Sequence, residues 1–354
     1  MRVSRRTAVV AAAVVALAAG SLSHSTPAVA GTATRPIPVI YDSDLDFDDA
    51  STLAYLCEEH KLRRIDLRAV TVANNGFGHP ERTLRHARSV LEQCGLPQVP
   101  IAEGALGEGV NPAPPELVST IENVLSGALG DADQPPYEAP LSAAELITRT
   151  VLRSKRPVTI VATGPLTNLA TVLSSRRVAR HIERIQIMGG ALHVPGNLYG
   201  SALPGFDNSQ EFNMWMDPVS ARAVLRNARP GSVHMVPLDA TESAPITQSF
   251  IARLAADQQA PGARLTYRIV SQPDMVELID LGIMYWWDAV AAVSLVHDDG
   301  SIATFQRLRV DVIQDGEQTG RTVIVPGGRP VQAALAADTA AFEQTFLDSL
   351  NGRP

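Results

Sequence analysis

The chain has 354 residues, of which 45% are apolar and 19% are charged, a composition typical of a globular protein and not of a disordered or fibrous one. Its formal net charge is -7, and this acidic balance, without a Lys/Arg cluster in the sequence, argues against a nucleic-acid or anionic-membrane partner. Two cysteines exclude a disulfide scaffold and a cysteine-built metal site, although Cys57 and Cys94 could form one disulfide if their helices touch.

Residues 1–30 have the organisation of a secretory signal peptide. A basic segment, 1–6, precedes an apolar segment, 8–19, and Ala28-Val29-Ala30 supplies the small residues that a signal peptidase recognises. The apolar segment is too short to span a bilayer, which needs roughly 20 residues. We therefore expect cleavage before Gly31 and a secreted protein, and the arginine pair ahead of the apolar segment is compatible with twin-arginine export.

Predicted strands and helices alternate along the rest of the chain. Strands are expected at 36–41, 65–72, 99–102, 158–162, 185–188 and 233–236, and helices at 50–57, 81–94, 143–154, 166–173 and 217–226. A long loop rich in Gly and Pro is expected at about 103–140, and residues 307–325 are typical of a C-terminal hairpin around Asp315-Gly316. This order predicts one α/β domain over residues 31–354, with an open, mostly parallel (mixed) sheet flanked by helices and ligands at the carboxyl ends of the strands.

An acidic loop follows the first predicted strand. It reads Asp42-Ser43-Asp44-Leu45-Asp46-Phe47-Asp48-Asp49, which places five carboxylates within eight residues. Without compensation these like charges would repel one another or become partly protonated. A hard cation is the simplest compensation, and all-oxygen ligands favour Ca²⁺ or Mg²⁺ over Zn²⁺. The alternative to a cation site is that the loop has no binding or catalytic function and is a solvated run of charged residues at the start of a helix.

Three functional interpretations of the acidic loop compete. An EF-hand-like loop fits the spacing of Asp42, Asp44 and Asp46, but Phe47 stands where glycine is needed and Leu53 where the closing glutamate should be. A strand–DxD phosphotransferase with an aspartyl nucleophile is expected to carry Thr or Val at the position of Asp46. The third interpretation, the strand–DxDxxxDD–helix arrangement of nucleoside hydrolases, fits the loop.

Four later segments resemble motifs of the same family, in the same order. They are Ala162–Ala170 (ATGPLTNLA), Ile187–Ala191 (IMGGA), the run from Gly196-Asn197 through Glu211-Phe212-Asn213 to Asp217-Pro218, and Tyr285–Ala289 (YWWDA). Together with the acidic loop they cover essentially the whole chain after the signal peptide. The sequence therefore resembles the inosine–uridine-type nucleoside hydrolases.

The resemblance implies a Ca²⁺ site. In the family the ion is held by the first motif, by a main-chain carbonyl and by a late aspartate, which correspond here to Asp44, Asp49, the carbonyl of Thr163 and Asp288. Each of these residues follows a strand or begins a helix, where an open sheet brings distant loops together. Asp42 is expected to support the loop through hydrogen bonds.

The reaction implied by the resemblance is hydrolysis of the N-glycosidic bond of a ribonucleoside to free base and ribose. A metal-bound water loses its proton more easily, and Asp44 is the expected general base. The ribose then develops positive charge that nearby carboxylates stabilise. Calcium bound by the ribose 2- and 3-hydroxyls would make the enzyme prefer ribose to deoxyribose, and Asp48 is expected to face the 2-hydroxyl.

Four further residues match sugar-site positions of the family. They are Asn75, Asn197, Glu211 and Asn213. A carboxylate and several amides suit vicinal hydroxyls because together they accept and donate hydrogen bonds. Taken singly, the same residues are also typical of turns and helix starts.

The chain departs from the family pattern at two places. Leu45-Asp46 replaces a common Pro-Gly pair, so we expect a different loop backbone with Asp46 turned to solvent. Trp287 replaces a histidine that many members place before the late aspartate, which resembles the purine-specific (inosine–adenosine–guanosine) branch, where an indole stacks on the purine. Leu117 stands at the position of that branch's second tryptophan, and Trp286 is expected to pack in the core.

The sequence leaves open which residues stack on the leaving base and which residue protonates it. Phe77 or Tyr199 could supply a second aromatic face, and neither His79 nor His193 is a clear acid, although both lie in predicted site loops. The sequence predicts a secreted, Ca²⁺-dependent purine ribonucleoside hydrolase acting on a small molecule. The alternatives are a hydrolase for another base, such as a pyrimidine, nicotinamide or a modified base, and a non-catalytic ribonucleoside-binding protein. The family often forms dimers or tetramers.

Overall fold

The computed structural model describes residues 35–104, 111–198 and 208–354. Arg35–Pro354 form one compact unit. The signal peptide expected at 1–30 lies outside the described residues, as does Tyr199. No helix among the described residues is long and apolar enough to cross a membrane.

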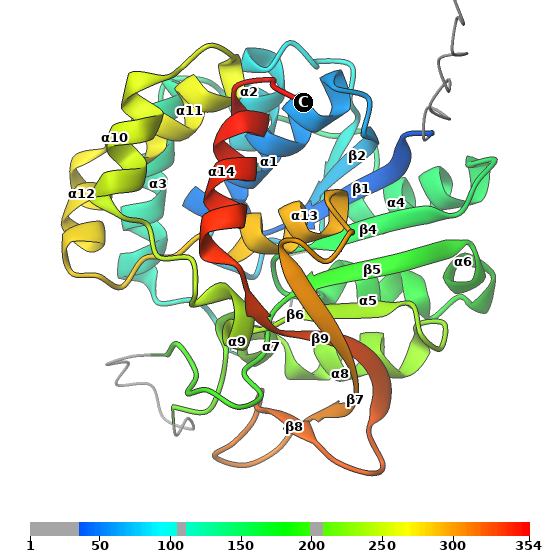
Figure 1. Ribbon diagram of the computed structural model, residues 1–354. Helices are drawn as coiled ribbons and strands as arrows, with labels where there is room; N and C mark the ends of the chain where they lie inside the picture. The colour runs from blue at the N-terminus through cyan, green and yellow to red at the C-terminus, as the bar shows by residue number, and fades with distance from the viewer. Residues whose placement is uncertain (1–34, 105–110, 199–207) are drawn as a thin grey trace, which may run out of the picture. The chain divides into compact units, whose positions relative to one another are not determined.

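A nine-stranded sheet runs through the middle of this unit in the order β3-β2-β1-β4-β5-β6-β9-β7-β8 (Figure 1). The strands are β1 Ile37–Ser43, β2 Ile65–Val72, β3 Ile101–Glu103, β4 Val158–Ala162, β5 Ile182–Met188, β6 Val233–Val236, β7 Ala303–Val312, β8 Thr322–Ile324 and β9 Arg329–Ala337. Neighbouring strands from β3 to β9 are parallel, and β7 is antiparallel to both β9 and β8. The predicted open, mostly parallel mixed sheet is therefore confirmed.

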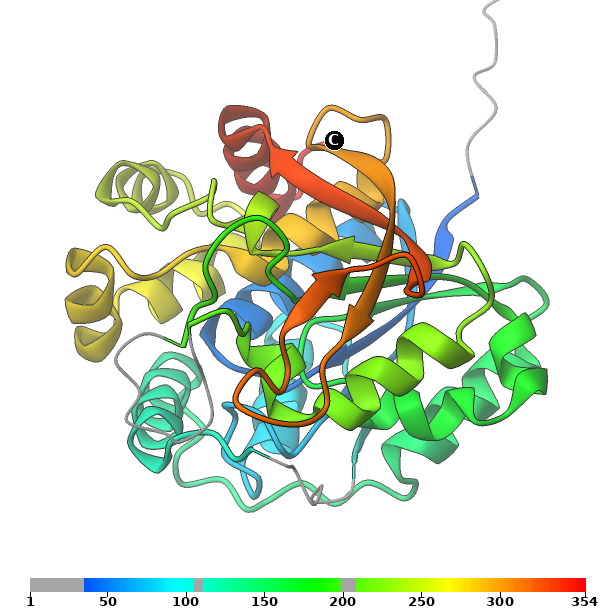
Figure 2. The ribbon, with the colours of Figure 1, turned by 90° about the horizontal axis from the view of Figure 1, so that it is seen from below.

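Helices cover both faces of the sheet, with α1 and α14 on one side and α5 and α8 on the other (Figure 1, Figure 2). The longer helices are α1 Phe47–Lys61, α2 Thr83–Gln93, α3 Pro115–Leu129, α4 Ala143–Arg153, α8 Pro218–Asn227, α10 Gln248–Ala256, α11 Pro261–Val270, α12 Pro273–Asp280, α13 Trp287–Val296 and α14 Thr339–Leu350. The short ones are α5 Thr167–Leu173, α6 Arg176–Arg180, α7 Phe212–Met216 and α9 Leu238–Thr241.

Alternating side chains of the buried strands divide the core into two layers. In β1, Val39 and Tyr41 pack with α1, α2, α13 and α14, whereas Ile40 packs on the other face with α4, α5 and α8. This is the arrangement expected when a strand is buried on both faces and successive side chains point to opposite sides. Trp286 is fully buried against Phe250 and Phe346, as predicted.

The predicted strands at 65–72, 158–162 and 233–236 agree with β2, β4 and β6. The long loop predicted at 103–140 is wrong, because α3 lies within it. Its prolines and glycines lie at its ends, with Pro115 in the first turn and Gly130 as a left-handed C-cap, so they delimit the helix instead of preventing it. The expected hairpin pairs β7 with β8, but it is followed by β9 and α14.

The sheet has a switch point between β1 and β4. From β1 the chain moves to β2 and β3 on one side, and from β4 it moves to β5 and β6 on the other. In open α/β sheets, loops diverge at such a point and leave a crevice beyond the carboxyl ends of the strands. The acidic loop leaves β1 and Thr163 leaves β4 at this place.

Candidate active site

Asp42 anchors the start of the acidic loop inside the protein. Its Oδ1 accepts hydrogen bonds from Thr71 Oγ1 at 2.5 Å and Asn168 Nδ2 at 2.9 Å. Burial raises the pKa of Asp42 to about 7, and these two hydrogen bonds oppose the rise. The predicted supporting contacts of Asp42 are therefore confirmed.

Asp44 lies in a space lined by glycines. A Cβ at Gly76 would overlap the Asp44 carboxylate, and a Cβ at Gly164 would come within 2.6 Å of the Asp44 backbone nitrogen. Phe77 N donates to Asp44 Oδ2 at 2.6 Å. Leu45 then takes a left-handed conformation with φ of 55°, which is uncommon for a residue with a side chain. These contacts hold Asp44 in one position at the end of β1.

Asp46 begins α1. Its Oδ1 accepts from Asp48 N at 3.1 Å and Asp49 N at 3.3 Å, and Asp46 N donates to Asp49 Oδ2 at 3.2 Å, so the two side chains form a reciprocal capping box. The expectation that Asp46 faces solvent is wrong, because its half-buried side chain lines the pocket described below. The capping interaction explains the difference, since it draws the side chain back over the first turn of α1.

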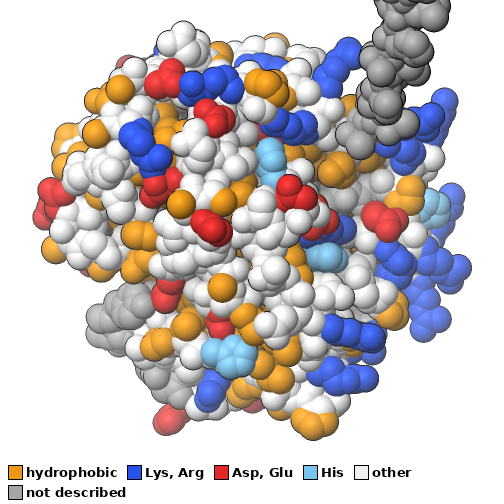
Figure 3. Space-filling model, in the orientation of Figure 1, with side chains coloured by type: hydrophobic (Ala, Val, Ile, Leu, Met, Phe, Trp, Pro, Cys, Tyr) orange, Lys and Arg blue, Asp and Glu red, His pale blue; other side chains and the backbone are white. Residues whose placement is uncertain are grey.

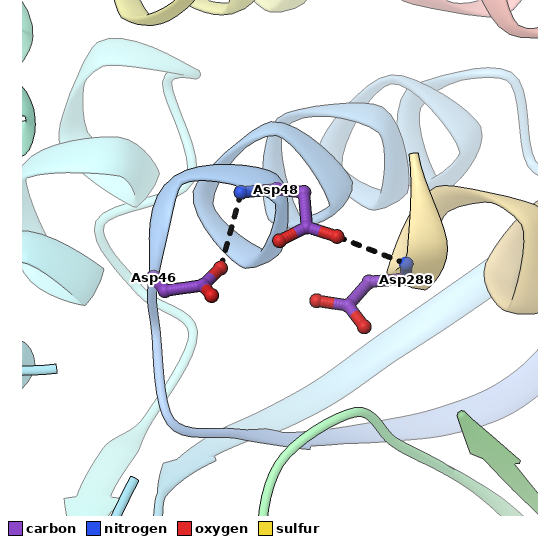
Figure 4. A group of neighbouring side chains, drawn as sticks. All are labelled: Asp46, Asp48 and Asp288. Atoms are coloured by element: carbon purple, nitrogen blue, oxygen red, sulfur yellow. Dashed lines mark hydrogen bonds between the residues drawn. The ribbon is translucent and has the colours of Figure 1, made fainter. Parts of the chain in front are cut away.

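Three carboxylates converge beyond the cap, from Asp46, Asp48 and Asp288 (Figure 4). One oxygen of each lies within 4.8 Å of the others. Asp288 begins α13, and its backbone N–H donates to Asp48 Oδ2 at 3.1 Å. Asp49 lies behind them, where its Oδ1 accepts from Tyr41 Oη at 2.7 Å and Thr163 Oγ1 at 2.6 Å.

These carboxylates lack the positive partners that usually accompany buried charges. Burial raises the pKa of Asp44, Asp46 and Asp288 well above its ordinary value, and the charges of neighbouring aspartates raise it further. Burial also raises the pKa of Asp48 to about 7. No Lys, Arg or His among the described residues forms an ion pair with them. An all-oxygen group of this charge fits a hard divalent cation.

The predicted sugar residues Glu211 and Asn213 lie close to Thr163. Asn213 Nδ2 donates to the Thr163 carbonyl at 2.8 Å. Glu211 caps α7 and accepts backbone N–H groups of Gly190, Asn213 and Met214 at 2.9–3.0 Å. Burial raises the pKa of Glu211, although these three hydrogen bonds lower it. Gly189 and Gly190, both with positive φ, therefore follow β5 at the same pocket, which Met188 also lines.

Asn197 and Asn75 have different surroundings. Asn197 lines the pocket, and its Oδ1 accepts from Phe212 N at 3.0 Å. Asn75 does not line it, because its Nδ2 is turned toward Thr167 and donates to Thr167 Oγ1 at 2.9 Å. Eight of the ten predicted site residues thus line the pocket described below, and Asp49 lies directly behind its carboxylates. The amide of Asn75 lies beside α5 instead.

A pocket of about 230 Å³ opens over the carboxylates. Its polar end is formed by Asp44, Asp46, Asp48, Thr163, Asn197, Glu211, Asn213 and Asp288. Its other wall is apolar and comes from Phe47, α3, α12, the segment between α12 and α13, and the start of α13. The apolar residues of this wall are Phe47, Leu117, Ile121, Leu278, Ile283, Met284 and Trp287. A pocket with one charged and one apolar end suits a ligand that joins a sugar to a heterocycle.

Trp287 is a wall of the pocket and not a core residue. It is half-buried, and it contacts Tyr285 at 5.4 Å and Phe47 at 6.3 Å between ring centroids. Leu117 lines the same pocket and is 38% exposed, and Phe77 lines it as well. No described histidine lines the pocket. His193 is exposed and pairs with Asp239. Cys57 and Cys94 are buried and free.

Sequence reasoning missed Asp46 and most of the apolar wall. The signal for Asp46 was available, because Asp at the N-cap followed by Asp at the third helical position is a helix-start pattern. The signal for α3 was the helical spacing of Leu117, Ile121, Val124 and Ala128. Leu278, Ile283 and Met284 carry no recognisable motif, because only the packing of α12 and of the segment that follows it brings them to the pocket.

Comparisons with known proteins find relatives by sequence. The chain is 37% identical over 225 residues to the pyrimidine-specific ribonucleoside hydrolase RihA of Salmonella enteritidis PT4, an alignment that covers 62% of this chain and 66% of that protein. Identity to RihA of Salmonella agona is 36% over 225 residues, with the same coverage of 62% and 66%. The chain thus aligns with just under two thirds of the length of these relatives.

Solved structures share the fold. An inosine-uridine preferring nucleoside hydrolase from Bacillus anthracis superposes with a TM-score of 0.77 at 22% identity, covering 89% of this chain and 99% of that one. A purine-preferring ribonucleoside hydrolase from Gardnerella vaginalis gives 0.68 at 22% identity, covering 89% and 98%. The family model described as inosine-uridine preferring nucleoside hydrolase matches residues 39–344. Because that match includes the acidic loop, Thr163 and Asp288, the chain belongs to the inosine-uridine preferring nucleoside hydrolase family.

Proposed function

We propose that this protein is a Ca²⁺-dependent hydrolase that cleaves the N-glycosidic bond of purine ribonucleosides to free base and ribose. One observation carries the proposal: Asp44 is held rigidly beside a group of carboxylates at the polar end of a pocket whose other end is apolar. The polar end suits ribose, and the apolar end suits a base.

Asp44 is the general base of the proposed reaction. Phe77 N–H holds its Oδ2, and glycines pack so closely around it that an added Cβ would overlap Asp44. Burial and the charges of Asp49 and Asp46 raise the pKa of the Asp44 carboxylate, which makes it a stronger base than a free aspartate. Asp44 takes the proton of a water molecule as that water attacks the anomeric carbon. The C–N bond breaks, and its electron pair leaves with the base.

The surrounding carboxylates stabilise the ribose as the bond breaks. The ring develops positive charge in the transition state, and the buried residues Asp48, Asp288 and Glu211 provide negative charge beside it. Asn213 and Asn197 supply amide groups beside them, suited to the hydroxyls of the sugar.

The donor set fits the calcium ion expected from the sequence. Asp44, Asp49, the Thr163 carbonyl and Asp288 are the proposed ligands, and all are oxygen donors at the switch point of the sheet. When bound, the cation supplies charge that lowers the pKa of water and holds the ribose hydroxyls. Mg²⁺ is the alternative that the same ligand chemistry allows.

Trp287 supports the purine assignment. Its indole lies in the apolar wall, where it offers a large flat surface to a stacked base. The described part of the pocket contains no histidine that could protonate the base, so solvent would deliver that proton. Stacking on the indole would make the purine easier to protonate, as the resemblance to the purine-specific branch implies.

A pyrimidine ribonucleoside is the second candidate substrate. The relatives at 36–37% identity are pyrimidine-specific. Leu117, facing the same pocket as Trp287, leaves the proposed aromatic sandwich without its second tryptophan and supports this alternative.

One assay separates these candidates. Release of base and ribose from inosine, adenosine, uridine, cytidine and nicotinamide riboside would be measured with Ca²⁺ and with a chelator. We expect inosine or adenosine to give the highest kcat/KM and the chelator to abolish turnover. Uridine or cytidine as the best substrate would replace the purine assignment. Nucleoside binding without release of any base would show a binding protein.

We also propose that the protein is exported and acts on nucleosides outside the cytoplasm, as a dimer or tetramer. The basic and apolar segments of residues 1–30 support export. Fractionation of the producing cells checks the location, and light scattering checks the oligomeric state.

A further inference from the structure

Asp46, with Leu45, is where the acidic loop departs from the pattern that the family resemblance implies, and only one of its two carboxylate oxygens caps the helix. Oδ1 accepts both backbone N–H groups of the α1 cap, from Asp48 and Asp49. No N–H or O–H of the described residues donates to Oδ2. The cap therefore fixes the orientation of the side chain and leaves one oxygen available.

The available carboxylate faces the negative group instead of solvent. One oxygen each of Asp46, Asp48 and Asp288 lies within 4.8 Å of the other two, and the three side chains converge on the same space (Figure 4).

Asp288 supplies an independent observation. Its side chain is only 4% exposed, and no N–H or O–H of the described residues donates to its carboxylate. A buried carboxylate without a donor is costly unless a cation compensates it. Asp288 points into the space that Asp46 borders, so a compensating cation there would also be close to Asp46.

We propose that Asp46 is an additional carboxylate of the cation site, which raises the affinity of the site and its preference for cations of higher charge. This inference rests on the cation site of the proposed function, and it concerns a residue outside the ligand set that the family resemblance implies. Cation affinity at oxygen sites rises with the number of charged ligands. The same charge has the opposite effect without a cation, because it adds repulsion among carboxylates.

The Asp46→Asn substitution removes the charge of Asp46 but keeps the helix cap. It therefore tests the effects of that charge on cation affinity and on repulsion among the carboxylates, separately from capping. Asn caps helices about as well as Asp, because its side-chain oxygen accepts the same backbone N–H groups. Asp338→Asn is the matched control: Asp338 caps α14 through a hydrogen bond from Ala341 N to its Oδ1 at 2.9 Å. Asp46→Ser, which also preserves a cap, serves if the Asn variant does not fold.

Calorimetric titration with Ca²⁺ and luminescence titration with Tb³⁺ provide the readout, together with thermal unfolding in a chelator. For Asp46→Asn we expect about tenfold weaker Ca²⁺ binding and a larger loss for Tb³⁺. In the chelator we expect its melting temperature to equal or exceed that of the wild type. Asp338→Asn should leave both affinities unchanged.

Unchanged Ca²⁺ and Tb³⁺ affinities in Asp46→Asn would overturn the inference, and so would an equal loss in Asp338→Asn. Neither result depends on turnover. If the wild type binds Ca²⁺ through Asp46 but hydrolyses no nucleoside, the inference stands and the proposed hydrolase function fails. If it hydrolyses nucleosides with unchanged metal binding in Asp46→Asn, the function stands and the inference fails.

Discussion

The reactive carboxylate of Asp44 lies in a space so closely surrounded by glycines that few other side chains would fit beside it. Gly76, Gly78 and Gly164 each approach its atoms so closely that a Cβ would displace it. Its Oδ2 is held by Phe77 N–H at 2.6 Å. A general base that is already in position before the substrate binds loses no further conformational entropy in the transition state. Rigid placement of the base therefore increases the reaction rate.

Asp44→Asn removes the proton acceptor but keeps the shape of the side chain. We expect kcat to fall about a thousandfold, or by roughly 4 kcal/mol of transition-state stabilisation. Inhibition by free ribose should change much less, since the other sugar contacts remain. Steady-state kinetics with ribose as inhibitor measure both quantities. Activity within tenfold of the wild type would exclude Asp44 as the base.

Trp287→Leu keeps an apolar wall and removes the aromatic face. Because an indole can stack on a purine and leucine cannot, we expect kcat/KM for inosine to fall about tenfold or more. Inhibition by ribose should be unaffected. Trp286, fully buried beside it, is the contrasting position, where the same substitution should lower the melting temperature instead. A loss of stability alone in Trp287→Leu would assign it to packing.

At the scale of elements, α3 connects the pocket to a buried polar cluster. Leu117, Thr120 and Ile121 face the pocket, and the next residue, Glu122, accepts from His86 of α2. His86 Nε2 lies 2.8 Å from Glu122 Oε2, and His86 Nδ1 lies 3.0 Å from Asp131 Oδ2. This buried histidine thus ties the middle of α3 and the turn after its C-terminus to α2.

The His86 cluster predicts a pH dependence of stability. Burial alone would lower the pKa of His86, but hydrogen bonds and charges from Asp131 and Glu122 outweigh it and raise the pKa. Burial would raise the pKa of both carboxylates, but the His86 hydrogen bonds lower it. A raised histidine pKa stabilises the fold below the ordinary value of about 6.5 and loses this effect as pH rises through the raised value. The carboxylates lose theirs as pH falls through their lowered values.

His86→Gln should therefore lower the free energy of unfolding most at mildly acidic pH. We expect a loss of about 2 kcal/mol in the free energy of unfolding between about pH 5 and 6, which shrinks as pH rises through the raised pKa of His86 in the wild type. Urea unfolding at a series of pH values, with saturating Ca²⁺ to keep the active site constant, measures the difference. A loss independent of pH would indicate a packing role for His86.

At the scale of the whole molecule, negative charge is collected where the sheet divides. The site draws on the acidic loop after β1, on Thr163 after β4, on Glu211 and Asn213 near β5, and on Asp288 at the start of α13. Their mutual repulsion opposes folding, so a bound cation should be linked to the stability of the entire unit.

Ca²⁺ should consequently raise the melting temperature. At a Ca²⁺ concentration about 100 times Kd, ligand linkage contributes about 2.7 kcal/mol. That corresponds to an upward shift of several degrees for a unit of this size. Differential scanning calorimetry with Ca²⁺ and with a chelator checks the shift, and Asp288→Asn should abolish most of it. Equal melting temperatures under both conditions would contradict a structural link to the cation.

Positive charge collects elsewhere on the surface. Figure 3 shows Lys and Arg side chains along the edge where α4 and α6 lie in Figure 1. Arg153 ends α4 and Lys155 follows it, whereas Arg176, Arg177 and Arg180 belong to α6, and all five are exposed. In the sequence, β4 and α5 separate the basic residues of α4 from those of α6, so the sequence alone shows no basic cluster. The fold creates the cluster because it places α4 beside α6.

The sequence by itself determined the alternation of strands and helices and the oxygen-rich chemistry of the site. Both are local properties: buried parallel strands need continuous apolar runs, and Asp42–Asp49 concentrate negative charge whatever surrounds them. The strand boundaries at β2, β4 and β6 were predictable for this reason. The family motifs then related Thr163, Glu211 and Asp288 to one site, although they are distant in the chain.

Only the tertiary structure decided the direction of side chains and the identity of the apolar wall. Asp46 faces Asp48 and Asp288 because the α1 cap draws it there, and the amide of Asn75 turns away because Thr167 of another helix accepts its hydrogen bond. The pocket residues of α3 and α12 meet only because these two helices pack against each other on the same face of the sheet. Such outcomes depend on contacts between residues far apart in sequence, and these contacts override local preference.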